Sequence, residues 1–320
     1  MSVNRRQVLH VHNKAERKRQ RADLGRLSSL VVTPRTETRY SKAVKEVFYF
    51  MKEEGIPLPD SHDDLDRVLS QYIEHLWEGG EGRSEASNAV AGLQHFLPNL
   101  RKNLPSSWRL LGAWQRSELP CRAPPLTWET LCSICGVFVS QGHTGAAIAL
   151  CVAFDGMLRT GEMLDVKASD VVISADSLTA VVSLGLTKGG KRRGVEETVV
   201  LDDPLVVSLL TVLLMSRKGG QKLIPLSQAK FRHLFAEALK KLDLEEIGFK
   251  PYSIRRGGAT WYLNATGSMS KVCVKGRWSS EKCARIYVND GLTTLAKLAF
   301  SRKANKLCAK YRSSFLKLIK

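Results

Sequence analysis

Apolar residues recur at helical spacing along the first third of the chain, and turn residues separate each stretch from the next. Stretches at 39–51 and 64–77 place their apolar side chains on one helical face, and glycine or proline follows each of them. A stretch rich in small residues starts at Ser84 and stops before Pro98, and a short fourth helix is expected at 108–116. The pattern predicts a small N-terminal domain that contains only helices.

Beyond Pro125 the pattern includes β-strands. β-branched residues predict three short strands, at 171–173, 178–184 and 195–201. Helices are expected before and after these strands, at 127–140, 144–158, 204–217 and 227–242, and in shorter pieces to the end. The chain is therefore expected to be mostly α with a small β-sheet, an α+β fold.

Proline and charge set the expected domain boundaries. The proline-rich segment 119–126 predicts a linker between a helical domain at 37–118 and a second domain at 127–320. Residues 1–36 form a basic arm that is too polar to fold alone, and we expect it to be disordered or to form a nascent helix. Such an arm suits a solvated tail, a contact with a DNA backbone or a nuclear import signal.

The charge of the chain indicates a polyanionic partner. Its 49 Lys and Arg residues outnumber its 31 Asp and Glu residues, which gives a net charge of +18 at pH 7. This charge suits nucleic acid or an anionic membrane surface. No apolar run approaches the roughly 20 residues of a membrane span, and the N-terminus lacks the apolar core of a secretory signal. We therefore expect a nucleic-acid partner, no membrane and no secretion.

The cysteines are expected to be reduced thiols. There are seven, an odd number, and they are scattered among apolar positions, which is typical of a cytosolic or nuclear compartment. Cys132 and Cys135 form a CxxC pair, but no second pair stands at zinc-ligand spacing. Their segment has the pattern of an apolar helix, so core cysteines are favoured over a metal site. No metal and no other cofactor are expected.

Six residues of the second domain are candidates for catalysis. Arg159 lies between an apolar helix and a new helix that contains Glu162, so packing and a carboxylate would both hold its side chain. The others stand in a glycine-rich hairpin turn, around a Pro-Tyr-Ser turn and in the last fifty residues or so of the chain. In chain order the six are Arg159, Lys188, Tyr252, Arg255, Trp278 and Tyr287.

The order and spacing of these residues resemble the tyrosine recombinase family, also called phage integrases. The segments that carry the resemblance are "GMLRTGE", "LGLTKGGKRRG", "YSIRRGGAT", "GRWSS" and "RIYVND", and Tyr287 lies nine positions after Trp278. The last three segments are most similar to eukaryotic branches of the family found in mobile elements. The resemblance covers most of the chain and implies a helical, SAM-like core-binding domain followed by a tyrosine recombinase catalytic domain.

The resemblance implies a role for each matched residue. Arg159 and Arg255 would hold the non-bridging phosphate oxygens, because guanidinium groups stay charged and bind such oxygens bidentately. Tyr287 would attack the phosphorus and form a reversible 3′-phosphotyrosyl ester. Lys188 would donate a proton to the departing 5′ oxygen, and the Trp278 indole would donate a hydrogen bond.

Position 252 departs from the family pattern, which has histidine three residues before the second arginine. Tyr252 can donate a hydrogen bond to phosphate, but it titrates at about pH 10 and cannot take a proton from Tyr287 as an imidazole would. An alternative interpretation is therefore a DNA-binding relative that has lost cleavage, and a type IB topoisomerase is a third. The adjacent Arg256 is expected at the surface or on a backbone phosphate.

The function implied by the resemblance is metal-independent cleavage and rejoining of DNA strands by a site-specific recombinase or integrase. The implied partners are double-stranded DNA and further copies of this chain, which would form a tetramer on two DNA sites. The C-terminal segment would pack on a neighbouring copy or fold back on its own chain. A nuclear location is expected in a eukaryotic host, and a cytoplasmic one otherwise.

Overall fold

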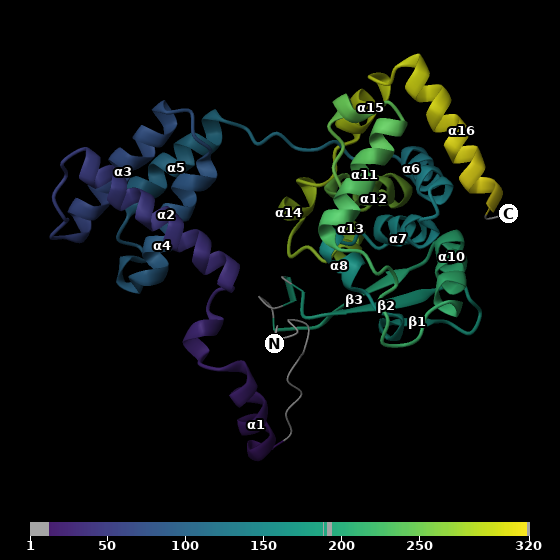
Figure 1. Cartoon of the computed structure of the whole chain (residues 1–320), viewed down its shortest axis with the longest axis horizontal. Coiled ribbons are helices and arrows are strands. Elements are labelled where there is room, and N and C mark those ends of the chain that lie inside the picture. The colour runs from purple at the N-terminus through teal and green to yellow at the C-terminus, as the bar shows by residue number, and fades with distance from the viewer. Residues whose placement is uncertain (1–12, 188, 191–193, 319–320) are drawn as a thin grey trace. The chain divides into compact units, whose positions relative to one another are not determined.

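The computed structural model describes residues 13–187, 189–190 and 194–318 (Figure 1). Two compact units make up the chain, one over residues 11–121 and the other over residues 122–320. The division falls inside the proline-rich segment 119–126. Lys188, which was predicted to be catalytic, and the basic residues 191–193 lie outside the described residues.

The described part of the first unit consists of helices and turns. Its helices are α1 (Lys14–Leu24), η1 (Leu27–Leu30), α2 (Pro34–Glu53), α3 (His62–Glu78), α4 (Arg83–Phe96), η2 (Pro98–Leu100) and α5 (Pro105–Ser117). Helices α2 to α5 surround one apolar core. Small residues let α4 approach α2, since a Cβ on Gly92 would lie only 3.1 Å from the Tyr40 carbonyl oxygen.

Helix α1 lies within the arm that was expected to be disordered or to form a nascent helix. Its sequence consists mainly of strong helix formers, and the side chain of Asn13 accepts a hydrogen bond from the Glu16 backbone N–H at its start. None of its side chains is buried. Local helix propensity and a cap therefore account for this helix, and no apolar core supports it.

A buried aspartate connects α3 to the start of α5. The Asp66 carboxylate is 4% exposed and accepts hydrogen bonds from the backbone N–H groups of Ser106 and Ser107, over 2.8 and 2.9 Å. Burial raises the pKa of Asp66, but these bonds and one from the Ser107 hydroxyl lower it to a net value below the ordinary one. The carboxylate thereby satisfies two of the free N–H groups of the α5 N-terminus.

The second unit combines helices with a small sheet. Its first half contains α6 (Trp128–Ser140), α7 (Thr144–Asp155), α8 (Thr160–Asp165), η3 (Ala168–Asp170), β1 (Val171–Ile173), β2 (Ala180–Gly185), β3 (Glu197–Leu201) and α10 (Pro204–Met215). Its second half contains α11 (Gln228–Lys241), η4 (Glu245–Ile247), α12 (Tyr252–Thr266), α13 (Met269–Gly276), α14 (Glu281–Arg285), α15 (Asp290–Leu298) and α16 (Arg302–Leu318). The expected fold class, mostly α with a small β-sheet, is confirmed.

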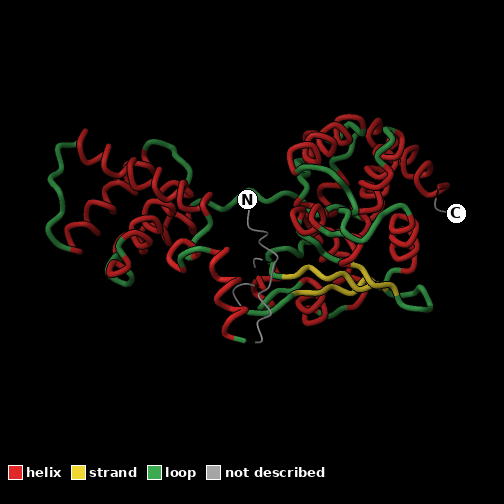
Figure 2. Tube along the Cα trace, turned by 60° about the horizontal axis from the view of Figure 1, so that its bottom comes forward, coloured by secondary structure: helices red, strands yellow, loops and turns green. Residues whose placement is uncertain are grey.

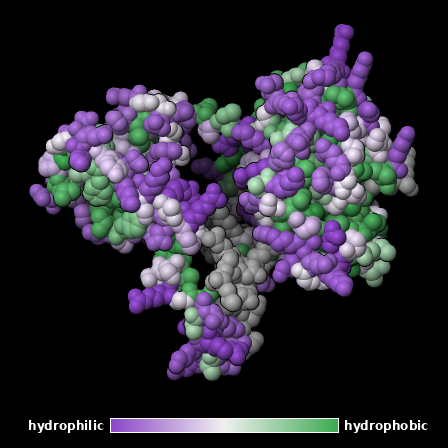
Figure 3. Space-filling view, in the orientation of Figure 1, coloured by the Kyte–Doolittle hydropathy of each residue, from purple (hydrophilic) through white to green (hydrophobic). Residues whose placement is uncertain are grey.

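The strands are antiparallel neighbours in the order β1-β2-β3 (Figure 2). Val182 of β2 pairs with Val171 on one side and with Val199 on the other. Side chains of β2 and β3 alternate between buried and exposed, so the sheet has one apolar face against the core. Hydrophilic side chains cover much of the visible surface (Figure 3).

Helices α6 and α7 form the centre of the second unit. Most residues of both are buried, among them Cys132 and Cys135, which confirms the prediction of core cysteines. The C-terminal α16 packs against α6 of its own chain, where a Cβ on Gly136 would lie 2.0 Å from the Tyr311 carbonyl oxygen.

No helix in the described ranges is both long and apolar enough to cross a membrane. Within the same ranges, no three His, Cys, Asp or Glu side chains are grouped in a way that could hold a metal ion.

Candidate active site

Arg159 lies directly after the turn that ends α7. The helix ends at Asp155, and the buried Met157 then adopts a left-handed backbone with φ of 45°, which redirects the chain. Arg159 is the N-cap of α8, where its backbone N–H donates to Glu162 Oε2 over 2.9 Å and its Nη1 pairs with Glu162 Oε1. Glu162 is 8% exposed and thus fixes both the backbone and the guanidinium of Arg159.

A pair of glycines places the helix that carries Arg255. A Cβ on Gly257 would lie 2.1 Å from the Leu126 carbonyl oxygen, and one on Gly258 would lie 2.0 Å from the Phe154 carbonyl oxygen. Only glycine at both positions lets α12 approach α7 and the segment before α6 so closely. The glycines that follow the two arginines in the sequence therefore determine how deep Arg255 lies in the unit.

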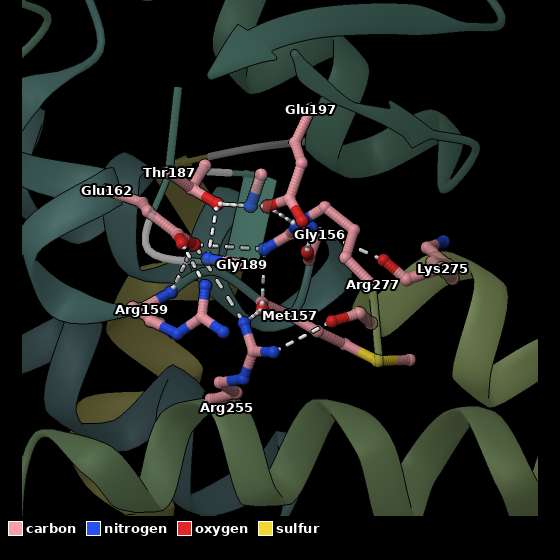
Figure 4. Close-up of polar contacts among 12 residues, drawn as sticks. Gly156, Met157, Arg159, Glu162, Thr187, Gly189, Glu197, Arg255, Lys275 and Arg277 are labelled. Carbon is pink, nitrogen blue, oxygen red and sulfur yellow. Dashed lines mark hydrogen bonds and ion pairs between the residues drawn. The ribbon is translucent and has the colours of Figure 1, made fainter. Parts of the chain in front are cut away.

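Arg255 and Arg159 converge on one carboxylate. Arg255 donates to the carbonyl oxygens of Met157 and Gly276, and its Nη1 lies 3.8 Å from Glu162 Oε2. The two arginines come from different elements and meet beside Glu162 (Figure 4). Burial and the charge of Arg159 lower the pKa of Arg255 to about 10, so this guanidinium remains protonated at neutral pH.

Trp278 and Tyr287 lie against Arg255. The centre of the Arg255 guanidinium is 4.6 Å from the centroid of the Trp278 ring and 5.4 Å from that of the Tyr287 ring. Gly276 provides room for the indole, because a Cβ there would lie 1.8 Å from Trp278 Cζ3. The indole Nε1 is buried and has no partner at hydrogen-bond geometry among the described residues, but it helps to lower the pKa of the neighbouring Tyr287 phenol. This N–H is therefore a donor beside the phenol.

Tyr252 lies beside Tyr287, with 5.3 Å between the ring centroids. Burial and the neighbouring Tyr287 raise the pKa of Tyr252 above its ordinary value. Burial also raises the pKa of Tyr287, but the Tyr252 hydroxyl and the charges of Arg255 and Arg159 lower it to a net value below the ordinary one. Of the two phenols, Tyr287 is consequently the one that gives up its proton more readily.

The expectation for Arg256 is wrong. Its side chain is 1% exposed, and its Nη1 donates to the carbonyl oxygen of Ile286 over 2.8 Å. Ile286 directly precedes Tyr287, so this bond attaches the segment with the phenol to α12. The sequence did not reveal this role because the two residues are thirty positions apart.

Two buried charged residues of the site, Arg277 and Glu197, were not found from the sequence. Arg277 Nη2 donates to Glu162 Oε2 over 2.9 Å, and its Nε lies 3.6 Å from Glu197 Oε2. Burial raises the pKa of Glu162, but the charges of Arg277 and Arg159 lower it to a net value below the ordinary one. Because Arg277 and Glu162 are 115 positions apart, local sequence carried no signal of their contact.

The residues that flank Lys188 are fixed by Glu197. The Thr187 hydroxyl donates to Glu197 Oε2, and Thr187 Oγ1 accepts hydrogen bonds from the N–H groups of Gly189 and Gly190, over 3.2 and 3.1 Å. This end of the β2–β3 connection is thus joined to Arg277 through one carboxylate (Figure 4).

Comparisons with solved structures identify the fold. The XerH site-specific recombinase bound to a palindromic difH substrate is 16% identical, with 82% of this chain and 78% of that one covered and a TM-score of 0.57. The Tn1549 transposon integrase in complex with transposon right end DNA is 13% identical, with coverages of 88% and 96% and a TM-score of 0.59. A lambda integrase dimer bound to a COC' core site is 17% identical, with coverages of 88% and 82% and a TM-score of 0.55.

These three structures are all tyrosine recombinases or integrases. No protein-family model matches the sequence, and a search of characterised proteins gives no match either. At such low identities the likeness establishes the fold: mostly helical, with a three-stranded antiparallel sheet, as in a tyrosine recombinase catalytic domain.

Proposed function

We propose that this protein is a site-specific DNA recombinase or integrase that cuts and rejoins strands through a phosphotyrosyl intermediate. The single observation that carries the proposal is the position of the Tyr287 phenol against Arg255, beside Arg159 and the unpartnered indole N–H of Trp278. Two guanidinium groups, one neutral donor and one phenol of lowered pKa match the demands of in-line attack on a phosphodiester.

Each side chain of the site has one role in the proposed cleavage step. The Tyr287 oxygen forms a bond to phosphorus while the bond from phosphorus to the 5′ oxygen breaks, which leaves a 3′-phosphotyrosyl ester. Arg159 and Arg255 bind the non-bridging oxygens, whose negative charge grows in the transition state, and the Trp278 N–H donates to one of them. We assign the proton for the departing 5′ oxygen to Lys188. No step requires a metal ion, because the guanidinium groups supply the positive charge.

Tyr252 takes a different role from the histidine that it replaces. The pKa of Tyr252 is raised, so near neutral pH it stays protonated and acts as a donor beside the Tyr287 oxygen. It therefore stabilises the phenolate form of Tyr287, while the proton of Tyr287 passes to solvent. Charge stabilisation by Tyr252 and Arg255 replaces general-base catalysis in this proposal.

We further propose that the partners are double-stranded DNA and other copies of the chain. The net charge of +18 suits the DNA backbone, and the three similar structures were solved with DNA. A tetramer on two DNA sites, an origin in a eukaryotic mobile element and a nuclear location complete the proposal. Helix α16, which packs on its own chain here, would have to detach from α6 in order to bind a neighbouring copy.

A covalent-adduct assay tests the function. The target sequence is unknown, so the probe is a pool of nicked duplexes with a randomised core, incubated with the protein and denatured in SDS. The wild type is expected to leave DNA attached to protein, and Tyr287→Phe is expected to leave none. The second candidate function, DNA binding without cleavage, is favoured by Tyr252; it predicts salt-sensitive binding of the same pool and no adduct.

A further inference from the structure

Arg277 occupies an unusual place in the chain. It follows the last residue of α13 and has a left-handed backbone, with φ of 60° and ψ of 37°, where glycine or asparagine is usual. Its side chain is nonetheless buried, with 5% exposed. A buried cation with a rarely used backbone conformation persists only where the surrounding contacts stabilise it, so the contacts of Arg277 indicate its role.

One group of contacts connects Arg277 to the Gly156–Met157 turn, which precedes Arg159. Its Nη1 donates to the Gly156 carbonyl oxygen over 3.1 Å, and its Nη2 donates to the Met157 carbonyl oxygen over 3.3 Å. Arg255 donates to the same Met157 carbonyl. Met157 itself has a left-handed backbone, so two residues in this rare conformation meet at one carbonyl oxygen. Arg277 thus supports the turn from inside the unit.

The other contacts place Arg277 between two buried carboxylates. Glu162, on one side, pairs with Arg159 and lies 3.8 Å from Arg255. Glu197, on the other, accepts the hydroxyl hydrogen bond of Thr187. One guanidinium therefore touches the carboxylate that orients the two phosphate-binding arginines and the carboxylate that holds the end of the β2–β3 connection (Figure 4).

We propose that Arg277 is a positioning residue: it holds Glu162 and the Gly156–Met157 turn so that Arg159 and Arg255 present their guanidinium groups at a fixed spacing to one phosphate. This inference rests on the proposed function. Both Nη groups of Arg277 donate to carbonyl and carboxylate oxygens, and its Nε lies beside Glu197, so we assign it no direct contact with the phosphate. It acts through Glu162, which must stay ionised in order to hold Arg159.

The proposal predicts a new pH dependence in Arg277→Gln. Glu162 faces Arg159 on its own helix, Arg255 on α12 and Arg277, with Glu197 beyond Arg277. Loss of Arg277 removes the largest positive influence on this buried carboxyl group, so its pKa rises. Glu162 then becomes protonated at a higher pH than in the wild type, and its ion pair with Arg159 is lost there.

Lys275 offers a matched control. It is also a buried cation of the same segment, and it pairs with Asp155 and Asp202 rather than with Glu162 or Glu197. Lys275→Gln therefore removes a buried charge of the same sign and keeps the Lys275 carbonyl oxygen, which accepts from Arg277 Nη1 over 3.3 Å. A general loss of stability should affect both variants, whereas a change in the pH profile should be confined to Arg277→Gln.

The experiment measures adduct formation between pH 6 and 9 on a nicked duplex that the wild type selects from the randomised pool. Arg277→Gln should react on the order of a hundredfold more slowly than the wild type at pH 8. Its rate should fall further on acidification, and Arg277→Lys should recover part of it. The proposal is overturned if Arg277→Gln reacts like the wild type, or if its loss is the same at every pH and equals that of Lys275→Gln.

A second readout does not depend on DNA. The melting temperature of Arg277→Gln should lie below that of the wild type at pH 8, and this deficit should shrink as the pH falls, because the raised pKa of Glu162 makes the folded variant bind a proton more tightly than the folded wild type does. Arg277→Lys, which keeps a charge, serves the same comparison if Arg277→Gln does not fold. Parallel pH profiles of melting for all variants would refute the inference, whereas absence of an adduct with the wild type would refute the proposed function instead.

Discussion

Replacement of Gly258 by alanine tests the contact between α12 and α7 that sets the position of Arg255. The added Cβ would lie 2.0 Å from the Phe154 carbonyl oxygen, whereas ordinary contact begins at 3.4 Å. The atom in the way is a backbone oxygen, which cannot move aside as the end of a flexible side chain can. The two helices must therefore separate by most of the 1.4 Å difference between these values, or lose their packing.

Both stability and cleavage should respond to this substitution. Overpacking of this kind costs about 1–3 kcal/mol, which for a unit of this size corresponds to a melting temperature lower by roughly 2–12 °C. A displacement of about 1 Å at a catalytic group can reduce a rate on the order of a hundredfold. Because Arg255 lies on α12, adduct formation should fall even at temperatures where Gly258→Ala remains folded.

The assay is thermal melting followed by circular dichroism, with adduct formation measured well below the transition. Gly112→Ala provides a control of opposite sign, because this glycine lies inside α5 and its nearest neighbour is the mobile Arg116 Nη1, 3.5 Å from the added Cβ. That change should stabilise α5 by roughly 1 kcal/mol. A Gly258→Ala protein that melts and cleaves like the wild type would refute the packing argument.

Three further predictions concern single groups. Tyr252→Phe removes the hydroxyl that lowers the pKa of Tyr287, so the pH profile of adduct formation should shift to higher pH; an unchanged profile would contradict this role. Trp278→Phe keeps a ring but loses the unpartnered N–H, and adduct formation should slow about tenfold, a loss of about 1.4 kcal/mol, while DNA binding measured by filter retention stays unchanged. Asp66→Ala should destabilise the first unit by about 1–2 kcal/mol in urea unfolding at pH 7. Since the folded pKa of Asp66 lies below its unfolded value of about 3.9, the difference between variant and wild type should persist above pH 4 and shrink as the pH falls through the folded pKa.

The helices of the first unit could be predicted because their apolar stripes and stop signals are local. Predicted and observed bounds of α3 and α4 differ by a residue or two. The start of α2 was predicted wrongly: the helix was expected from residue 39 but begins at Pro34, after its N-cap Thr33 and inside the expected arm. Another difference arises where distant contacts decide the structure. Helix α7 was expected to continue to 158, but it ends at Asp155, because the Gly156–Met157 turn is held by arginines from distant segments.

The candidate site was only partly accessible from the sequence. Spacing and resemblance selected Arg159, Arg255, Trp278 and Tyr287, which the structure brings together, and Tyr252, which lies beside the phenol. Their supporting residues were missed. Burial of a charged residue can be predicted only when its partner is known. The partners of Arg256, Arg277 and Glu197 lie far from them along the chain.

The most direct test of the central claim is to identify the residue that carries DNA after cleavage. The adduct formed on the nicked pool is digested with protease and nuclease, and the modified peptide is sequenced by mass spectrometry. The proposed function predicts a nucleotide attached to Tyr287 through its 3′ phosphate. Attachment to any other residue, or DNA binding without a covalent product under conditions where the protein is folded, would contradict it.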